Sequence, residues 1–274
     1  MPEALAISSS GRFDADSAAF YRQVLSSLSA AGVPFLVGGA LACTCYTGIE
    51  RNTKDVDLFI RGGDFERVRE VLRQSGHETE LTYPHWLAKV RGGDHLLDLI
   101  FSSGNGVSAV DDAWFEHAVS VELLGLAVRI APVEETIWSK AFIMERERYD
   151  GADIAHLLHA RADRLDWPRL LERFGPHWRV LLSHLVLFGF VYPAQRSRVP
   201  AWVMNGLLDR LREEQQAPAP AEPVCQGTLL SREQYLDDIE QHGLRDARLA
   251  PLGQMAPQDV AVWTEAIPDR QPSE

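Results

Sequence analysis

The strongest constraint on the fold is a pair of aspartates, Asp55 and Asp57, set one residue apart in an apolar segment that ends at Ile60. Side chains alternate between the two faces of a β-strand, so residues i and i+2 point the same way. A strand here aims both carboxylates at one point and turns Val56 and Leu58 toward a core. Two acidic groups beside a core repel each other unless a positive charge lies between them. The segment therefore predicts a strand with a charged site on one face.

A third carboxylate, Asp98, lies inside a second apolar run, Leu96–Phe101. On a neighbouring strand it would complete a cluster with Asp55 and Asp57. Carboxylate oxygens suit Mg²⁺ or Mn²⁺, and two such ions about 3.5–4 Å apart can clamp the attacking and leaving oxygens of a phosphoryl transfer. The ordinary alternative for an Asp-x-Asp pair is a solvated strand end or a helix cap.

Two consecutive glycines, Gly38 and Gly39, favour the catalytic interpretation. They follow an apolar stretch at 33–37 that reads as a buried strand, and a helix-like segment at 40–46 follows them. Glycines at a strand end let a backbone approach a phosphate closely. The start of the next helix presents free N–H groups and the positive end of its dipole there. This turn is therefore a candidate phosphate-binding element.

The glycine pair followed by Asp55-Val-Asp57 resembles the signature of the polymerase-β-like nucleotidyltransferase superfamily. With Arg51, Thr53 and Asp98 added, the chain is similar to the small bacterial branch that includes AbiEii-type toxins and relatives of lincosamide nucleotidyltransferases. The resemblance covers roughly residues 17–160. It implies an α/β (α+β) fold in which a mixed-sheet catalytic domain precedes a helical domain.

Beyond the glycine turn, the candidate nucleotide-binding residues are Thr53, within the resembled motif, and three basic residues. By the resemblance, Lys140, early in the first helix after Pro132, would reach the nucleotide's triphosphate; the alternative is a solvated helix lysine. Arg51 and Lys54 flank the acid pair and either offset its charge, touch phosphate or are plain surface charges. Asp150 and Asp153 further along are interpreted mainly as a helix cap and ion-pair partners of Arg146.

Composition narrows the class of protein. The formal net charge is −12, which disfavours large nucleic-acid substrates, because affinity for phosphate backbones comes mostly from Lys and Arg. Cys43, Cys45 and Cys225 lack the spacing of a zinc site and are expected to be small apolar residues of a reduced cytosol. No apolar run of about 18–20 residues and no signal peptide is evident, so we expect a cytoplasmic protein without a membrane partner.

Hydrophobic periodicity and the positions of glycines and prolines divide the chain into four parts. Residues 13–132 form the expected catalytic domain, with strands at 77–81, 86–91, 95–101, 119–123 and 126–130 and a hairpin turn at Gly92-Gly93-Asp94. Residues 133–216 carry helical periodicity, starting with a helix expected at 133–146. Residues 217–223 form a proline-rich linker, and 224–274 are expected to be a helical extension, with a helix that opens at Ser231, and a tail. Near the start of the chain, Asp14 or Asp16 is expected to cap a first helix.

The function expected from these features is metal-dependent transfer of a nucleoside monophosphate from an NTP, such as ATP, to an acceptor hydroxyl, with release of pyrophosphate. Asp55 and Asp57 would hold Mg²⁺ or Mn²⁺, and Asp98 would help bind a second ion and act as general base. The acceptor could be a small molecule, a protein or tRNA. Two alternatives stay open: a non-catalytic nucleotide-binding or toxin/antitoxin-type module with an antitoxin-like partner, and a two-metal phosphohydrolase.

Overall fold

The structure is a computed structural model that describes residues 13–50 and 55–267. It divides into two compact units, the first ending at Pro132 and the second beginning at Val133. Three predicted nucleotide-binding residues, Arg51, Thr53 and Lys54, lie outside the described residues. None of the helices in the described ranges combines the length and the apolar composition that crossing a membrane requires.

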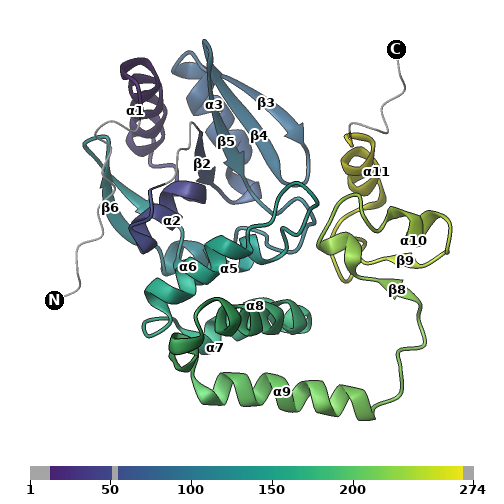
Figure 1. Ribbon diagram of the computed structural model, residues 1–274. Coiled ribbons are helices and arrows are strands. Elements are labelled where there is room, and N and C mark those ends of the chain that lie inside the picture. Colours follow the sequence, from purple (N-terminus) through teal and green to yellow (C-terminus); the bar gives the residue numbers. More distant parts are fainter. Residues whose placement is uncertain (1–12, 51–54, 268–274) are drawn as a thin grey trace. The chain divides into compact units, whose positions relative to one another are not determined.

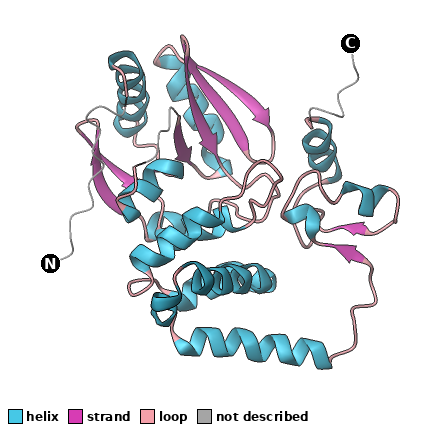
Figure 2. Ribbon diagram, viewed as in Figure 1, coloured by secondary structure: helices cyan, strands magenta, loops and turns pink. Residues whose placement is uncertain are grey.

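The first unit is built on a mixed sheet, drawn as magenta arrows in Figure 2, whose described strands follow the order β3-β4-β5-β2-β1-β7-β6. The pairs β2/β5 and β1/β7 are parallel, and the other neighbours are antiparallel. The mixed sheet with its helices confirms the predicted α/β class. The strands are β1 (Leu36–Val37), β2 (Val56–Phe59), β3 (Glu78–Tyr83), β4 (Leu87–Gly92), β5 (His95–Ile100), β6 (Val119–Leu123) and β7 (Leu126–Ile130).

Alternation along the central strands separates a core face from a polar face. Val56 and Leu58 on β2 and Leu97 and Leu99 on β5 have no exposed surface. The residues between them point the opposite way, and Asp57 is among them. Burying four aliphatic side chains stabilises the sheet by roughly 1.5–3 kcal/mol each, which outweighs the cost of holding a carboxylate on the other face.

Helices of the first unit accompany the sheet (Figure 1). α1 starts where Asp14 caps it, the carboxylate accepting a hydrogen bond from the Ser17 N–H at 2.8 Å. α1 and α3 contact each other, and they also contact β5 and β3, respectively. The short helix α4 was not predicted; it begins at an Asp111 cap. The bounds are α1 (Ala15–Ala30), α2 (Gly39–Thr47), η1 (Gly62–Asp64), α3 (Phe65–Gln74) and α4 (Asp112–Glu116).

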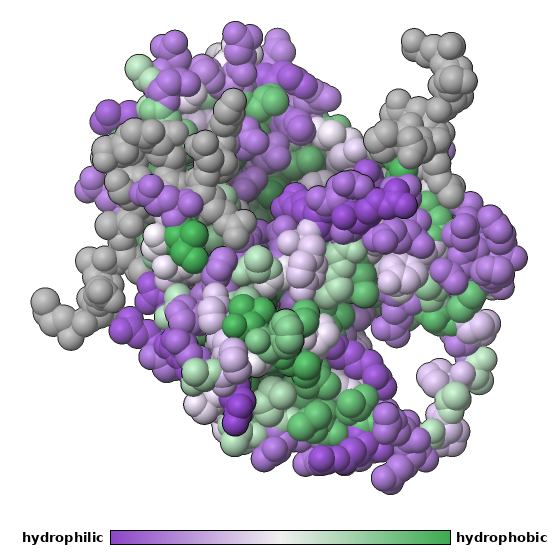
Figure 3. Space-filling view, in the orientation of Figure 1, coloured by the Kyte–Doolittle hydropathy of each residue, from purple (hydrophilic) through white to green (hydrophobic). Residues whose placement is uncertain are grey.

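The second unit is mainly helical. Its first helix ends at Ala141, five residues before the predicted end, because the backbone beyond it pairs elsewhere: the Met144 N–H donates to the Leu230 carbonyl at 3.0 Å. Figure 3 shows apolar surface in the region of α8 and α9. The helical elements are α5 (Val133–Ala141), α6 (Gly151–Arg161), α7 (Trp167–Phe174), η2 (Gly175–His177), α8 (Trp178–Val191), η3 (Pro193–Arg198) and α9 (Ala201–Gln216).

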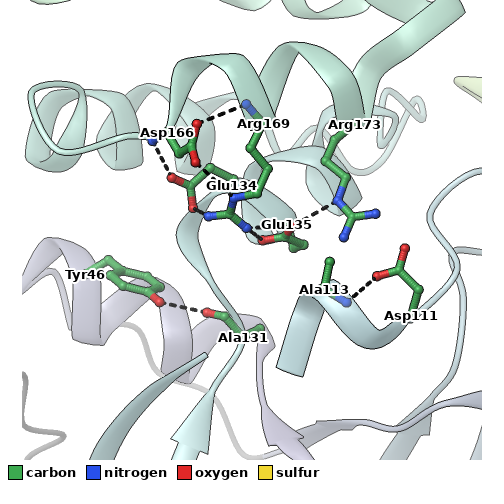
Figure 4. Close-up of polar contacts among 9 residues, drawn as sticks. All are labelled: Tyr46, Asp111, Ala113, Ala131, Glu134, Glu135, Asp166, Arg169 and Arg173. Atoms are coloured by element: carbon green, nitrogen blue, oxygen red, sulfur yellow. Dashed lines mark hydrogen bonds and ion pairs between the residues drawn. The ribbon is translucent and has the colours of Figure 1, made fainter. Parts of the chain in front are cut away.

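A buried ion-pair network joins α5 to α7 (Figure 4). The Glu135 carboxylate, which has no exposed side-chain surface, accepts from Arg169 at 2.7 Å and from Arg173 at 3.0 Å. Glu134 also pairs with Arg169 and accepts from the Asp166 N–H at 2.7 Å. Charges this deeply buried are tolerated only when they are paired and hydrogen-bonded. The network is therefore structural.

The last described residues contain short strands that the sequence did not predict. β8 (Val224–Cys225) pairs in parallel with β9 (Arg245–Asp246), and the buried Arg248 side chain pairs with Asp246 at 2.6 Å. A helix predicted to open at Ser231 begins only at Leu236. Treating 224–274 as a separate extension stays a prediction. The remaining elements are η4 (Gly227–Leu229), α10 (Leu236–Glu240) and α11 (Pro257–Glu265).

Candidate functional site

Two of the three predicted carboxylates stand side by side in the sheet of the first unit. Asp57 on β2 and Asp98 on β5 are register partners in a parallel pair. Neighbouring strands lie about 4.8 Å apart, and partners in register point to the same face. Asp55 is exposed and comes directly before β2. The long-range pairing of β2 with β5 therefore brings together residues about forty positions apart in the sequence.

The electrostatics show that all three carboxylates share one neighbourhood. The pKa of Asp98 lies above its usual range, chiefly because the carboxyl is partly buried; Lys89 lowers it, and the Asp55 carboxylate raises it. On α1, burial and then the negative charges of Asp55, Asp14, Asp57 and Asp98 raise the pKa of Tyr21 to about 12. A phenol resists ionising beside several carboxylates because its charged form would add another negative charge.

Tyr21 also ties α1 to the strand that carries Asp98. Its side chain is almost fully buried, and its hydroxyl donates to the Leu96 carbonyl at 3.2 Å. Leu96 lies two residues before Asp98 on β5. The helix is therefore anchored next to the site.

The glycine turn lies against the Asp57 side chain. Gly38 donates its N–H to the Asp57 carbonyl at 2.9 Å, and a Cβ added at Gly38 would stand 2.0 Å from the Phe59 ring. Gly39 has φ +55°, and a Cβ there would stand 1.6 Å from an Asp57 carboxylate oxygen. Only glycine fits either position without displacing a neighbour. The turn thus places the start of α2, at Gly39, beside the Asp57 carboxylate.

The predicted metal site was compared with the described geometry. Among the residues that the structure describes, no three His, Cys, Asp or Glu side chains stand close enough together to hold an ion. Asp57 and Asp98 form an adjacent pair, and Asp55 contributes charge next to them. The convergence of all three on one ion stays a prediction.

Lys140 is largely, though not fully, buried within the second unit. Its ammonium pairs with Asp150 at 2.7 Å and with Asp153 at 2.9 Å, and Asp150 also pairs with Arg148 at 3.1 Å. Lys140 is therefore not a solvated lysine, and the partners seen for Asp150 are Lys140 and Arg148 where Arg146 was expected. A contact between Lys140 and the triphosphate stays a prediction.

Two neighbours of the site, Lys89 and Tyr21, were not among the predicted site residues. Lys89 on β4 is the antiparallel partner of Asp98. The sequence held part of the signal for Lys89. The predicted turn at 92–94 would have opposed 89 to 97, but the loop is only Gly93-Asp94, so Gly92 pairs with His95 and Lys89 with Asp98. No sequence pattern marked Tyr21, since its placement depends on how α1 packs.

Comparisons with known proteins were made for the whole chain. A family described as uncharacterised nucleotidyltransferases matches residues 14–179, more than half of the sequence. No curated protein matches. This family match agrees with the resemblance seen in the glycine pair and the Asp-x-Asp strand.

Solved structures give more distant likenesses. The antibiotic-resistance factor ANT(2'')-Ia is 17% identical over 74% of this chain and 97% of its own, with a TM-score of 0.38. The lincosamide antibiotic adenylyltransferase LnuA is 14% identical over 55% of this chain and 100% of its own, with a TM-score of 0.38. A nucleotidyltransferase-like protein from Paracoccidioides brasiliensis is 14% identical over 69% and 94%, with a TM-score of 0.42. None is similar enough to lend its substrate to this chain. By its family match, the chain belongs to the uncharacterised nucleotidyltransferases.

Proposed function

We propose that this nucleotidyltransferase moves a nucleoside monophosphate from an NTP to an acceptor hydroxyl in a reaction that depends on a divalent metal ion. The observation that carries the proposal is the register pair of Asp57 and Asp98 with the Gly38-Gly39 turn packed against it. Carboxylates and backbone N–H groups in one place suit a metal–triphosphate, since one binds the cation and the other the anion.

Asp55, Asp57 and Asp98 would hold Mg²⁺ or Mn²⁺, which when bound neutralises the phosphates and polarises the reacting phosphoryl group. The N–H groups at the start of α2 would orient the phosphates. Asp98 would accept the proton of the acceptor hydroxyl, a role helped by the burial that raises the pKa of its carboxyl above the usual range.

The acceptor oxygen then forms a bond to the α-phosphorus. The bond from the α-phosphorus to its bridging oxygen breaks, and pyrophosphate leaves with that electron pair. The resemblance adds Arg51, Thr53, Lys54 and Lys140 as phosphate contacts within this proposal. Positioning and charge compensation supply most of the acceleration in such transfers.

For the acceptor we propose a small hydroxylated molecule or a protein in preference to tRNA. The net charge of −12 supports this choice, because a strongly acidic surface repels a nucleic-acid backbone. An antitoxin-type partner rests on the resemblance alone.

The test is incubation with each α-labelled nucleoside triphosphate, Mg²⁺ or Mn²⁺ and a cell extract. We expect pyrophosphate release and a labelled acceptor with the parent protein and neither with Asp57→Asn. Asp94→Asn, at an exposed position in the β4–β5 turn, is the matched control and should behave like the parent. The metal-free Asp57→Asn protein should fold as well as the parent or better, because one charge of a self-repelling pair is gone.

Equal labelling by the parent and Asp57→Asn would refute the assignment. Nucleotide binding without any pyrophosphate release would favour a non-catalytic module. Release of inorganic phosphate with no labelled acceptor would indicate a phosphohydrolase.

A further inference from the structure

One charged side chain from each of four neighbouring strands falls in a single row across the sheet of the first unit. Glu80 on β3 is the register partner of Lys89 on β4, Lys89 is the partner of Asp98 on β5, and Asp98 is the partner of Asp57 on β2. Directly opposed residues point to the same face, with Cβ atoms about 4.5–5.5 Å apart in antiparallel pairs. The row therefore reads acid, base, acid, acid.

Lys89 has an acid on each side of it in the row. One is Glu80, which has another cationic partner, and the other is Asp98 of the proposed metal-binding pair. Glu80 forms an ion pair at 3.0 Å with Arg91, one row away on the same face as Lys89. Ala88 and Val90, the sequence neighbours of Lys89, are fully buried on the other face. The β4 backbone thus holds the lysine beside Asp98.

The positive charge of Lys89 lies next to the Asp57–Asp98 pair. Lys89 and Asp98 are directly opposed residues of the antiparallel β4/β5 pair, on the face that Asp98 shares with Asp57. A directly opposed pair of unlike charges on antiparallel strands is a stabilising arrangement. Without Lys89, the Asp57–Asp98 pair would face its own repulsion in the metal-free protein.

We infer that Lys89 is the resident counter-ion of Asp98 and that its positive charge opposes the binding of a divalent cation beside this carboxylate. The inference rests on the proposed function in naming the cation. Lys89 is a positioning residue here. It stabilises the carboxylates when no metal ion is bound, and its own positive charge weakens the binding of the divalent cation. The affinity of the site for metal is then set partly by a strand that supplies no ligand.

The test compares Lys89→Met with Arg91→Met in the full-length protein. Both variants remove one positive charge from the same strand and the same face, but only Lys89 is opposite Asp98. Titration calorimetry with Mn²⁺ alone should show binding roughly five- to twentyfold tighter for Lys89→Met, because a nearby positive charge no longer opposes the ion. Arg91→Met should stay within about twofold of the parent, and Lys89→Arg should match the parent.

The second measurement is the Tm in EDTA. We expect Lys89→Met to lower the Tm by about 2–4 °C more than Arg91→Met does. In an Asp98→Asn background the extra loss should vanish, because the carboxylate that needs a counter-ion is gone. If Lys89→Met does not fold, Lys89→Gln replaces it.

Equal effects of Lys89→Met and Arg91→Met on both measurements would overturn the inference, as would weaker Mn²⁺ binding by Lys89→Met. Loss of triphosphate affinity alone, with the Tm and Mn²⁺ affinity unchanged, would make Lys89 a phosphate contact and also overturn it. If the parent protein fails to bind Mn²⁺, the metal dependence in the proposed function fails. The Tm comparison in EDTA with the Asp98→Asn background still decides whether Lys89 compensates the pair.

Discussion

Replacing Gly39 by alanine separates the geometry of the site from the stability of the fold. Gly39 has φ +55°, and its new Cβ would stand 1.6 Å from an Asp57 carboxylate oxygen. Ordinary contact begins near 3.4 Å, so the carboxylate must retreat by about 1.8 Å. The left-handed backbone costs an alanine about 1–2 kcal/mol, while a carboxylate at the end of a side chain rotates away at little further cost.

Gly48→Ala is the matched control. Gly48 ends the same helix with φ +71°, and nothing lies within 4 Å of an added Cβ. Both variants should therefore lose about 1–2 kcal/mol of unfolding free energy in chemical denaturation. Only Gly39→Ala should lose affinity for Mn²⁺ and for the metal–triphosphate, by roughly 10- to 100-fold in calorimetry, the range found when support for a metal ligand is removed.

The reasoning fails if both variants bind Mn²⁺ and nucleotide as the parent does, because the Asp57 carboxylate would then be free to move without consequence. It also fails if Gly39→Ala unfolds while Gly48→Ala stays folded. In that case the glycine would serve the fold and not the position of Asp57.

Three further predictions concern other parts of the chain. Above pH 10 an unfolded tyrosine ionises while folded Tyr21 stays protonated to about 12, so stability falls over that window; Tyr21→Phe should abolish about 2 kcal/mol of this loss in denaturation at pH 10 and 12. Arg169→Met takes the arginine partner from buried Glu134 and leaves buried Glu135 with Arg173 alone, so it should cost about 3–5 kcal/mol, whereas Arg179→Met breaks an exposed pair and should cost less than about 1 kcal/mol. Lys140→Met should destabilise the fold because it removes one cationic partner from each of two buried aspartates, and adding Asp150→Asn should recover part of the loss. If Lys140 also contacts the triphosphate, the double variant should bind ATP about tenfold more weakly than Asp150→Asn alone.

Local patterns in the sequence predicted much of the first unit. The strand at β2 followed from alternation, and the predicted core residues Val56 and Leu58 have no exposed surface. A cap at Asp14 or Asp16 was predicted for the first helix, and Asp14 is the cap of α1; the turn at 92–94 predicted the β4–β5 hairpin. These features depend on contacts between near neighbours, which a single sequence records directly.

Elements held by distant partners were predicted poorly. α5 ends at Ala141 because backbone groups beyond it bond to residues far along the chain, among them Leu230. The two-residue strands β8 and β9 are too short to show any periodicity. Helix α10 starts late, at Leu236, although Ser231 accepts the Gln234 N–H as a cap would.

The candidate site also combines features that local sequence patterns predicted with features that distant contacts decided. Residue types and spacing alone indicated that Asp55 and Asp57 share a face, that Asp98 joins them from another strand, and that a glycine turn precedes them. The parallel pairing of β2 with β5 decided that Asp57 and Asp98 are adjacent, and the packing of α1 brought Tyr21 near them. Register between distant strands depends on the summed burial of both, a quantity that exists only once the chain has folded.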